Sequence, residues 1–344
     1  MKKIVYYITD HGLGHATRSI AIIRKILKNN IEVTIRNSNA VDFISKSLGD
    51  IKIKTGITDI GTKIKKDGLS IDILQSKKQI NPWIDNLEKF ASKEELFLTK
   101  IKPNLIISDI SAMPFIVAKK LDIPSMAISN FSWYDAYNFL TKKRQEKLFD
   151  AYQNANLAIK LPYGTDMKHF QNLIKTGLIC RIPIMNKSKI KNKLDVKNSE
   201  KIVVFALGGG KSIIKFRSNK DVKIFSLNTK IDKKIKSTDL SSWIEGQEII
   251  SIADVIFCKC GYGFISEALT NGIPFYYLKD PNHKEQNHMD LNLKEKNFGV
   301  NIEKCDLNNL EFNQKFFDKI KPQKKQKIDY KVTDLINEIL KTQK

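Results

Sequence analysis

The sequence of 344 residues lacks the patterns of a membrane-spanning, secreted or metal-binding protein. No apolar run approaches the length of about 18 residues that spans a bilayer, and the N-terminus carries no signal-peptide pattern. The four cysteines show no metal-ligand spacing and imply no disulfide framework; they are Cys180, Cys258, Cys260 and Cys305. An Asp-x-Asp metal motif is also missing. We therefore expect a cytoplasmic protein that holds no metal and no other cofactor.

Acidic residues are scarce relative to basic ones, with 37 Asp+Glu against 59 Lys+Arg and a formal net charge of +22. Lysine far outnumbers arginine and is spread along the whole chain, whereas a nucleic-acid footprint usually clusters on one face. We therefore expect no nucleic-acid partner. Attraction to an anionic nucleotide ligand, or peripheral contact with the inner face of an anionic membrane, fits the charge better.

Strands and helices alternate along the chain, and a hydrophobic content of 42% supports sizeable cores. This order predicts an α/β protein with two Rossmann-like parallel domains, residues 1–185 and 186–325. A last helix at 326–344 is expected to pack back toward the N-terminal domain. Because the strand ends of both domains must face a shared ligand, we also expect a cleft between them.

The N-terminal strand-loop-helix unit resembles a dinucleotide fold, but the glycine fingerprint fails. Gly12 and Gly14 are followed by Thr17 where a third glycine should stand. The second strand ends in Arg36 rather than in an acidic residue for a ribose. A nicotinamide or flavin site is therefore disfavoured.

The rest of the first half contains one long polar segment and one aromatic one. The polar, glycine-containing composition of residues 56–81 predicts a long mobile loop with a little helix, and loops of such length are often functional. A helix is expected over 82–100, with Pro82 in its first turn. We interpret the aromatic stretch 131–139 as core rather than as an acceptor surface.

A glycine-rich segment follows a strand at two places in the second half. The strand 201–207 precedes three consecutive glycines at 208–210, and only a short helix fits before the next strand at 221–227. The apolar strand 254–257 leads through Gly261 and Gly263 into a helix. Glycines there let a ligand approach the backbone, and the free N–H groups at a helix start attract phosphate.

Two parts of the chain carry a family resemblance. The first is Gly12-Leu-Gly14-His15-Ala-Thr-Arg18, a GxGHxxR pattern, and the second runs from Trp243 to Gln286. In this order the motifs resemble glycosyltransferases of the GT-B architecture. They are similar to the family 28 C-terminal domain, to the lipid-II-forming N-acetylglucosaminyltransferase and to uncharacterised GxGHxxR-type relatives. The resemblance covers nearly the whole chain.

The resemblance implies an inverting, metal-independent glycosyltransferase that moves a sugar from a nucleotide-sugar, usually a UDP-sugar, to a hydroxyl of a glycan, lipid or small-molecule acceptor. The implied donor-binding residues are Arg181, Gly208, Gly209, Gly210, Ile244, Gly261, Tyr262, Gly263, Phe264, Ile265, Ser266, Glu267, Glu285 and Gln286. Among them Ile244 would meet the base, Glu267 the ribose diol and Arg181 the pyrophosphate. Glu285 and Gln286 would contact the donor sugar.

Catalysis then needs a base for the acceptor hydroxyl, and His15 is our candidate. A helix N-terminus favours the neutral imidazole that a base requires, and Asp109 would orient the ring. The alternative roles are structural: His15 would only cap its helix, and Asp109 would only begin the next one. His11 is the reserve base. Gly12, Gly14 and Arg18 are expected on the acceptor and phosphate side, with Arg18 pairing either with phosphate or with Asp10.

Three other functions stay open at this stage. A nucleotide-sugar hydrolase of the pseudaminic-acid pathway shares the architecture and the opening motif, with the histidine activating water. A non-catalytic sugar-nucleotide-binding protein is compatible with the short segment after Gly210. A two-domain epimerase is the weakest of the three.

Overall fold

The computed structural model describes residues 1–210 and 212–342. The chain forms two compact units, each built from separated segments. Unit 1 comprises Met1–Lys63, Asp72–Ile179 and Ile328–Lys344; unit 2 comprises Ile64–Ile71 and Cys180–Lys327. The main boundary therefore falls a few residues before the expected one at 185. The assignment of Ile64–Ile71 to unit 2 was not anticipated.

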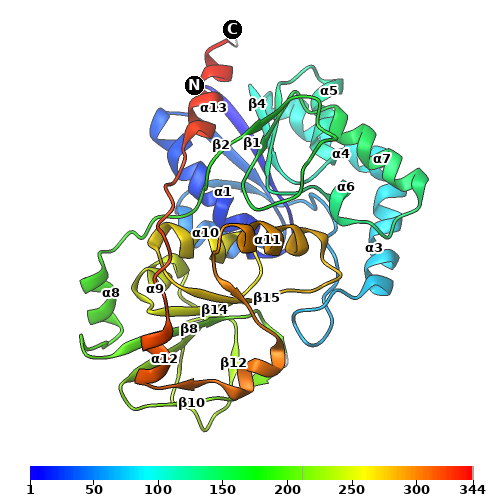
Figure 1. Cartoon of the computed structure of the whole chain (residues 1–344). Helices are drawn as coiled ribbons and strands as arrows, with labels where there is room; N and C mark the ends of the chain where they lie inside the picture. Colours follow the sequence, from blue (N-terminus) through cyan, green and yellow to red (C-terminus); the bar gives the residue numbers. More distant parts are fainter. Residues whose placement is uncertain (211, 343–344) are drawn as a thin grey trace. The chain divides into compact units, whose positions relative to one another are not determined.

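Unit 1 is built, within its described residues, on a seven-stranded sheet in the order β3-β2-β1-β4-β5-β6-β7. Figure 1 labels β1, β2 and β4 of this sheet. The strands are β1 (Lys3–Ile8), β2 (Glu32–Arg36), β3 (Lys52–Lys54), β4 (Leu105–Asp109), β5 (Ser125–Ser129), β6 (Leu157–Lys160) and β7 (Leu173–Lys175). All neighbours are parallel. Ile8 pairs with Asp109, so β1 and β4 end side by side.

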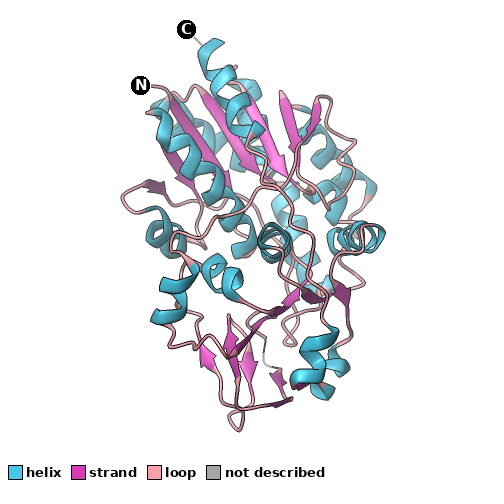
Figure 2. Cartoon of the chain, turned by 60° about the vertical axis from the view of Figure 1, so that its left-hand side comes forward, coloured by secondary structure: helices cyan, strands magenta, loops and turns pink. Residues whose placement is uncertain are grey.

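Helices lie on both faces of this sheet (Figure 2). They are α1 (Leu13–Ile26), α2 (Val41–Leu48), α3 (Ile73–Asp85), α4 (Leu87–Ile101), α5 (Met113–Lys120), α6 (Trp133–Ala136), α7 (Lys142–Gln153) and α13 (Lys331–Thr342), with a 3-10 turn at Leu27–Asn29. Helix α13 packs beside α1 (Figure 1). It buries Val332, Ile336 and Leu340, spaced by about one helical turn.

The structure corrects the expected helix over 82–100. Helix α3 already begins at Ile73, capped by the Asp72 side chain, so the long loop is shorter than predicted. Pro82 lies inside α3 rather than in a first turn. The helix ends soon after this proline, and α4 starts anew at Leu87.

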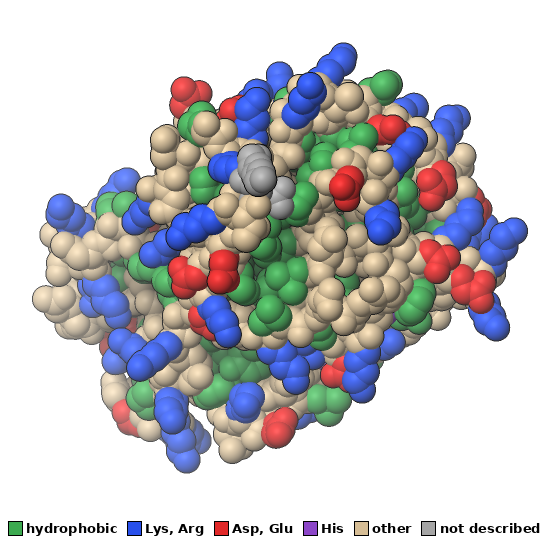
Figure 3. All heavy atoms as spheres, turned by 90° about the horizontal axis from the view of Figure 1, so that it is seen from above, with side chains coloured by type: hydrophobic (Ala, Val, Ile, Leu, Met, Phe, Trp, Pro, Cys, Tyr) green, Lys and Arg blue, Asp and Glu red, His purple; other side chains and the backbone are tan. Residues whose placement is uncertain are grey.

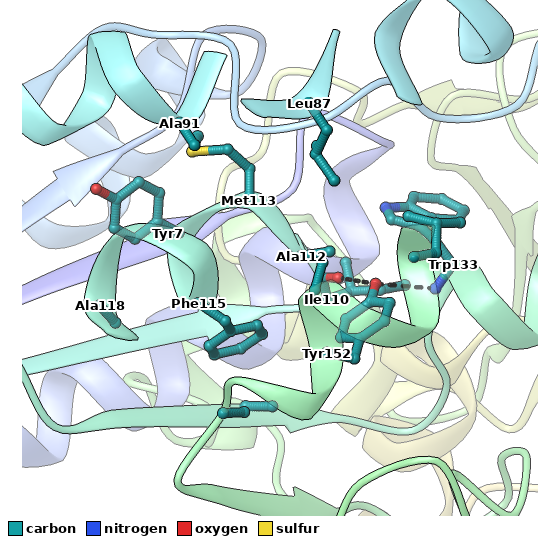
Figure 4. Packing of buried hydrophobic residues seen from close by; sticks show 14 of the residues in the cluster. Tyr7, Leu87, Ala91, Ile110, Ala112, Met113, Phe115, Ala118, Trp133 and Tyr152 are labelled. Carbon is teal, nitrogen blue, oxygen red and sulfur yellow. Dashed lines mark hydrogen bonds between the residues drawn. The ribbon is translucent and has the colours of Figure 1, made fainter. Parts of the chain in front are cut away.

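The aromatic stretch 131–139 belongs to the core of unit 1, as predicted. Phe131, Trp133 and Tyr137 are each no more than 2% exposed. The Tyr152 hydroxyl donates to the Ile110 carbonyl and accepts from the Trp133 N–H at 3.1 Å, which fixes this segment against α7 (Figure 4). Buried polar groups paired in this way keep one packing arrangement.

Unit 2 contains, in its described part, a six-stranded parallel sheet in the order β13-β11-β8-β14-β15-β16. Its strands are β8 (Lys201–Ala206), β11 (Val222–Ser226), β13 (Thr238–Asp239), β14 (Val255–Lys259), β15 (Phe275–Leu278) and β16 (Val300–Asn301). Its helices are α8 (Lys187–Lys193), α9 (Gly246–Ile252), α10 (Tyr262–Asn271), α11 (Lys284–Glu295) and α12 (Gln314–Lys319), with a 3-10 turn at Lys304–Asn309.

The short helix expected after Gly210 is absent from the described residues, which corrects the prediction. Two small parallel ribbons stand there, β9 (Ile213–Ile214) with β12 (Lys230–Ile231), and β10 (Arg217–Ser218) with β17 (Glu311–Phe312). They bring Phe216 and Phe312 onto the face of the sheet. Phe205 of β8 stacks on Phe216 and Phe257 at 5.0 Å in both cases. These rings bury the surface that a helix would otherwise cover.

None of the helices among the described residues is both long and apolar enough to cross a bilayer. Figure 3 shows one face of the molecule, on which Lys and Arg side chains are scattered rather than gathered in one patch.

Candidate active site

The strand order of unit 1 reverses direction between β1 and β4, which is a topological switch point. Ligands of open parallel sheets bind outside the carboxyl ends of the strands at such points. The loop after β1 ends at Gly12 and leads into α1, whose second residue is Gly14; both glycines are exposed. Gly12 caps that helix with φ of 75°, a conformation that favours glycine. His15 and Asp109 therefore approach one another from two neighbouring strand ends.

His15 and Asp109 form a direct pair. His15 lies in the first turn of α1 and Asp109 is the last residue of β4, and His15 Nδ1 is 2.8 Å from Asp109 Oδ1. His15 is 8% exposed and Asp109 is 1% exposed. Phe131 contacts the imidazole edge-on, with ring centroids 5.5 Å apart.

Arg18 lies one turn further along α1 and binds the same carboxylate, not Asp10. Its Nε donates to Asp109 Oδ2 at 2.7 Å and its Nη2 to Asp109 Oδ1 at 2.5 Å. The Asp10 carboxylate instead accepts the backbone N–H groups of Ser38, Asn39 and Thr58. The structure thus gives Arg18 a partner, Asp109, that neither of the two alternatives, phosphate and Asp10, had named.

The hydrogen bonds of Arg18 determine which nitrogen of His15 carries the proton. His15 Nδ1 lies 2.6 Å from Arg18 Nη2, but both N–H groups of that nitrogen already have oxygen acceptors, Asp109 Oδ1 and, at 2.9 Å, Ser129 Oγ. Nδ1 must therefore donate to Asp109. This tautomer leaves the lone pair on Nε2, the arrangement that a general base needs.

Asp109 is held ionised. Burial alone would raise the pKa of its carboxyl, but the adjacent Arg18 and His15 together lower that pKa from 3.8 to about 2. Ser19 Oγ donates a further hydrogen bond to Oδ2 at 3.0 Å. A permanent negative charge here stabilises the positive charge that His15 acquires when it accepts a proton.

Sequence reasoning missed three residues around this pair. Asn130 Oδ1 accepts from Arg18 Nη1, and Ser129 also binds Arg18. Asp59 accepts hydrogen bonds from Trp133 Nε1 and Thr9 Oγ1, each at 2.7 Å. Burial raises the pKa of Asp59 from 3.8 to about 7. Only the position of Ser129 and Asn130 at a strand end offered a signal in the sequence.

The reserve base His11 stands in the same loop but has different surroundings. It contacts Trp133 edge-on, with ring centroids 5.3 Å apart, and a Cβ placed on Gly61 would overlap its ring. The backbone N–H of His11 donates to Thr9 Oγ1 at 3.1 Å, whereas the imidazole of His15 lies 2.8 Å from the Asp109 carboxylate.

In unit 2 the strand order reverses between β8 and β14, so their carboxyl ends form a second switch point. Phe257 pairs with Phe205 and Cys258 with Ala206, which aligns the two strand ends. The structure places the predicted donor residues of this region after those strands: Gly208, Gly209 and Gly210 follow β8, and Gly261, Tyr262, Gly263, Phe264, Ile265, Ser266 and Glu267 cap and begin α10.

Three of the predicted donor residues form one hydrogen-bonded cluster, in which Arg181 and Glu267 are buried. Arg181 Nε donates to Glu267 Oε1 at 3.0 Å, and Arg181 Nη1 donates to the Ile244 carbonyl at 3.0 Å. Burial raises the pKa of Glu267, and Arg181 opposes that shift. Arg181 thus fixes the position of the Glu267 carboxylate and of the backbone carbonyl of Ile244.

The remaining predicted pair lies at the start of α11. Glu285 and Gln286 are 8% and 2% exposed. Gln286 Oε1 accepts the N–H of Asp280 at 2.7 Å, which ties the start of α11 to the segment after β15. Lys259 ends β14 nearby; burial lowers its pKa, while Glu285 and Asp280 raise it.

Among the described residues, no group of three or more His, Cys, Asp or Glu side chains gathers as metal ligands.

The fold of the two units identifies the class of protein. Two parallel α/β units of this kind match the fold of GT-B glycosyltransferases. A family model described as "Glycosyl transferase family 1" matches residues 2–320, so the chain belongs to that family and is a glycosyltransferase. The narrower likeness to family 28 stays a prediction. The matched family does not favour the hydrolase interpretation.

Individual relatives are distant. The L-arabinokinase of Arabidopsis thaliana is 24% identical over 324 residues, which cover 88% of this chain but only 30% of that protein. An uncharacterized glycosyltransferase of Methanosarcina acetivorans is 24% identical over 332 residues, 86% of this chain and 84% of that one. A UDP-glucose: anthocyanidin 3-O-glucosyltransferase in complex with UDP has a TM-score of 0.58 at 13% identity, covering 99% of this chain and 93% of that one.

Proposed function

We propose that the protein is an inverting, metal-independent glycosyltransferase that takes a UDP-sugar as donor and a hydroxyl of a glycan, lipid or small molecule as acceptor. The observation that carries the proposal is the His15–Asp109 pair, in which Asp109 accepts from Nδ1 and leaves Nε2 as the base. In this proposal unit 1 provides the base and unit 2 binds the donor.

His15 Nε2 takes the proton of the acceptor hydroxyl as its oxygen attacks the anomeric carbon. The bond from that carbon to the β-phosphate oxygen breaks, and the electron pair leaves with the diphosphate. The imidazolium that forms is stabilised by the ionised Asp109. One displacement from the opposite side inverts the anomeric configuration, and no covalent sugar–enzyme intermediate is needed.

The donor assignment rests on the second switch point. Glu267 is suited to accept from a ribose diol, and Arg181 would orient it. The N–H groups at the start of α10, after Gly261, would face the diphosphate. Since the charge of Arg181 is largely offset by Glu267, we assign the charge on the leaving diphosphate to Lys259 and these N–H groups. The UDP bound to the anthocyanidin glucosyltransferase, which has the same fold, supports the choice of UDP.

Helix N-termini and basic side chains can stabilise a leaving diphosphate without a metal ion, which is why we propose metal independence. The net charge of +22 is also compatible with peripheral contact with an anionic membrane when the acceptor is a lipid.

The test compares two histidine variants in a transfer assay with UDP-sugars and a panel of acceptors. His15→Ala should lower kcat by roughly 10²–10⁴-fold, the usual contribution of a general base, with UDP affinity unchanged. His11→Ala, in the same loop, serves as the matched control and should stay near wild type. Loss of activity in His11→Ala alone would move the base to His11. A product with retained anomeric configuration, measured by NMR, would reject the mechanism.

A further inference from the structure

The segment Ile64–Ile71 leaves unit 1 after Lys63 and returns to it at Asp72, yet it belongs to unit 2. It forms a narrow hairpin, closed by a bridge between Ile64 and Ile71 and by the Lys65 N–H bonded to the Ser70 carbonyl at 2.8 Å. At its tip Asp67 Oδ1 accepts the N–H groups of Leu69 and Ser70, each at 2.9 Å. The hairpin therefore holds its shape through its own hydrogen bonds.

The hairpin tip lies directly against the glycine loop that follows β8. Gly68 has φ of +78°, and a Cβ added there would stand 2.5 Å from the Cα of Gly210. A Cβ on Gly210 would in turn overlap the Asp67 carbonyl. Real side chains do not approach so closely, so the two backbones meet at a distance that only glycine allows.

Two further contacts hold the hairpin in this position. Leu69 packs against the hydrophobic core of unit 2 that contains Phe205 and Phe257. The Ile71 N–H donates to Asp280 Oδ2 at 2.5 Å, a buried hydrogen bond to a charged group. Asp280 is the residue whose own N–H binds Gln286, one of the two residues expected to contact the donor sugar.

The hairpin thus reaches both sides of the region assigned to the donor: the glycine loop after β8 and the segment between β15 and α11. It contacts Gly210, after which the described residues form no helix before β11. We propose that Ile64–Ile71 forms one wall of the nucleotide-sugar site and that donor affinity depends on its docked position; this inference rests on the proposed function.

The first test is Gly68→Ala in the full-length protein, with UDP affinity measured by isothermal titration calorimetry. Gly49→Ala is the matched control, because Gly49 has nearly the same φ of +74° but nothing within 4 Å of an added Cβ. Both variants place an alanine at a positive φ, and only Gly68→Ala pushes the hairpin off Gly210. We expect a loss of UDP affinity of roughly tenfold or more in Gly68→Ala, and wild-type affinity in Gly49→Ala.

The second test needs no variant, so it holds even if Gly68→Ala does not fold. Lys65 and Lys66 are exposed on the hairpin, and Lys197 is an exposed residue elsewhere in unit 2. If docking and donor binding are coupled, the coupling is reciprocal. UDP should then slow tryptic cleavage after Lys65 and Lys66 more than cleavage after Lys197.

The outcomes separate the two proposals. Either of two results overturns the role of the hairpin and leaves the proposed function standing. The first is a UDP affinity that is equal in wild type, Gly49→Ala and Gly68→Ala. The second is cleavage of the hairpin that UDP does not slow selectively. Wild-type protein that binds no UDP overturns both.

Discussion

The buried carboxylate of Asp109 allows a stability prediction that can be worked out from its surroundings. Asp109→Asn keeps the size of the side chain but removes the charge opposite Arg18, which is only 2% exposed. A pKa lowered from 3.8 to about 2 corresponds to about 2.5 kcal/mol of folding stability at neutral pH. Removing one partner of a buried ion pair typically costs about 3–5 kcal/mol. We therefore expect a loss of about 3 kcal/mol at pH 7.

The pH dependence of this loss follows from the sign of the shift. Because the folded pKa lies below the unfolded one, the stabilisation is fully present above pH 3.8 and disappears as the pH falls through about 2. Urea unfolding of wild type and Asp109→Asn should therefore differ most at neutral pH and converge between pH 4 and pH 2.

Asp85→Asn is the matched control for this measurement. Asp85 also binds an arginine through two hydrogen bonds, to Arg144 at 2.9 and 2.6 Å, but its side chain is 44% exposed. Exposed pairs of this kind contribute little, so the control should lose much less stability. Equal losses in the two variants, or a loss in Asp109→Asn that does not change with pH, would refute the reasoning.

Three further predictions concern other sites. Glu267→Ala should weaken UDP binding by roughly 1.5–3 kcal/mol, since a ribose diol loses a charged acceptor; unchanged affinity in calorimetry would reduce Glu267 to a structural partner of Arg181. Burial raises the pKa of Asp59 to about 7, so the free energy of unfolding of the wild type should fall as the pH rises from 4 to 7. Over that range the stability of Asp59→Asn should increase by up to roughly 4 kcal/mol relative to the wild type. Parallel stability curves for the two proteins would exclude this effect. Phe257→Ala, in the stacked core of unit 2, should cost about 3–5 kcal/mol in urea unfolding, and a cost below 1 kcal/mol would mean that the ring cluster is not a tight core.

Several features of the site follow from local patterns in the sequence. His15 begins a helix after a strand, and Asp109 ends another strand. Two adjacent parallel strands bring such residues to the same edge of a sheet, so their proximity could be predicted. The partner of Arg18 could not, because Asp109 stands 91 positions away and local spacing offered Asp10 instead.

The second half shows where local reasoning fails. A helix was expected after Gly210 because such a helix is usual in this kind of unit. The residues Ile213, Ile214 and Phe216 are β-branched or aromatic, a local composition that favours strands over a helix. The docking of Ile64–Ile71 had no local signal, since Gly68 meets Gly210 only through long-range packing.

The division of unit 1 into segments from both ends of the chain affects how it is made on the ribosome. Helix α13 packs beside α1 but is translated only after all of Cys180–Lys327. At roughly 5–20 residues per second, translation of that stretch alone leaves α1 without its neighbour for roughly 7 to 30 seconds. During that interval the nascent N-terminal half exposes an apolar face of α1, and a chaperone has its best opportunity to bind there. Premature termination before Lys331 would make that exposure permanent.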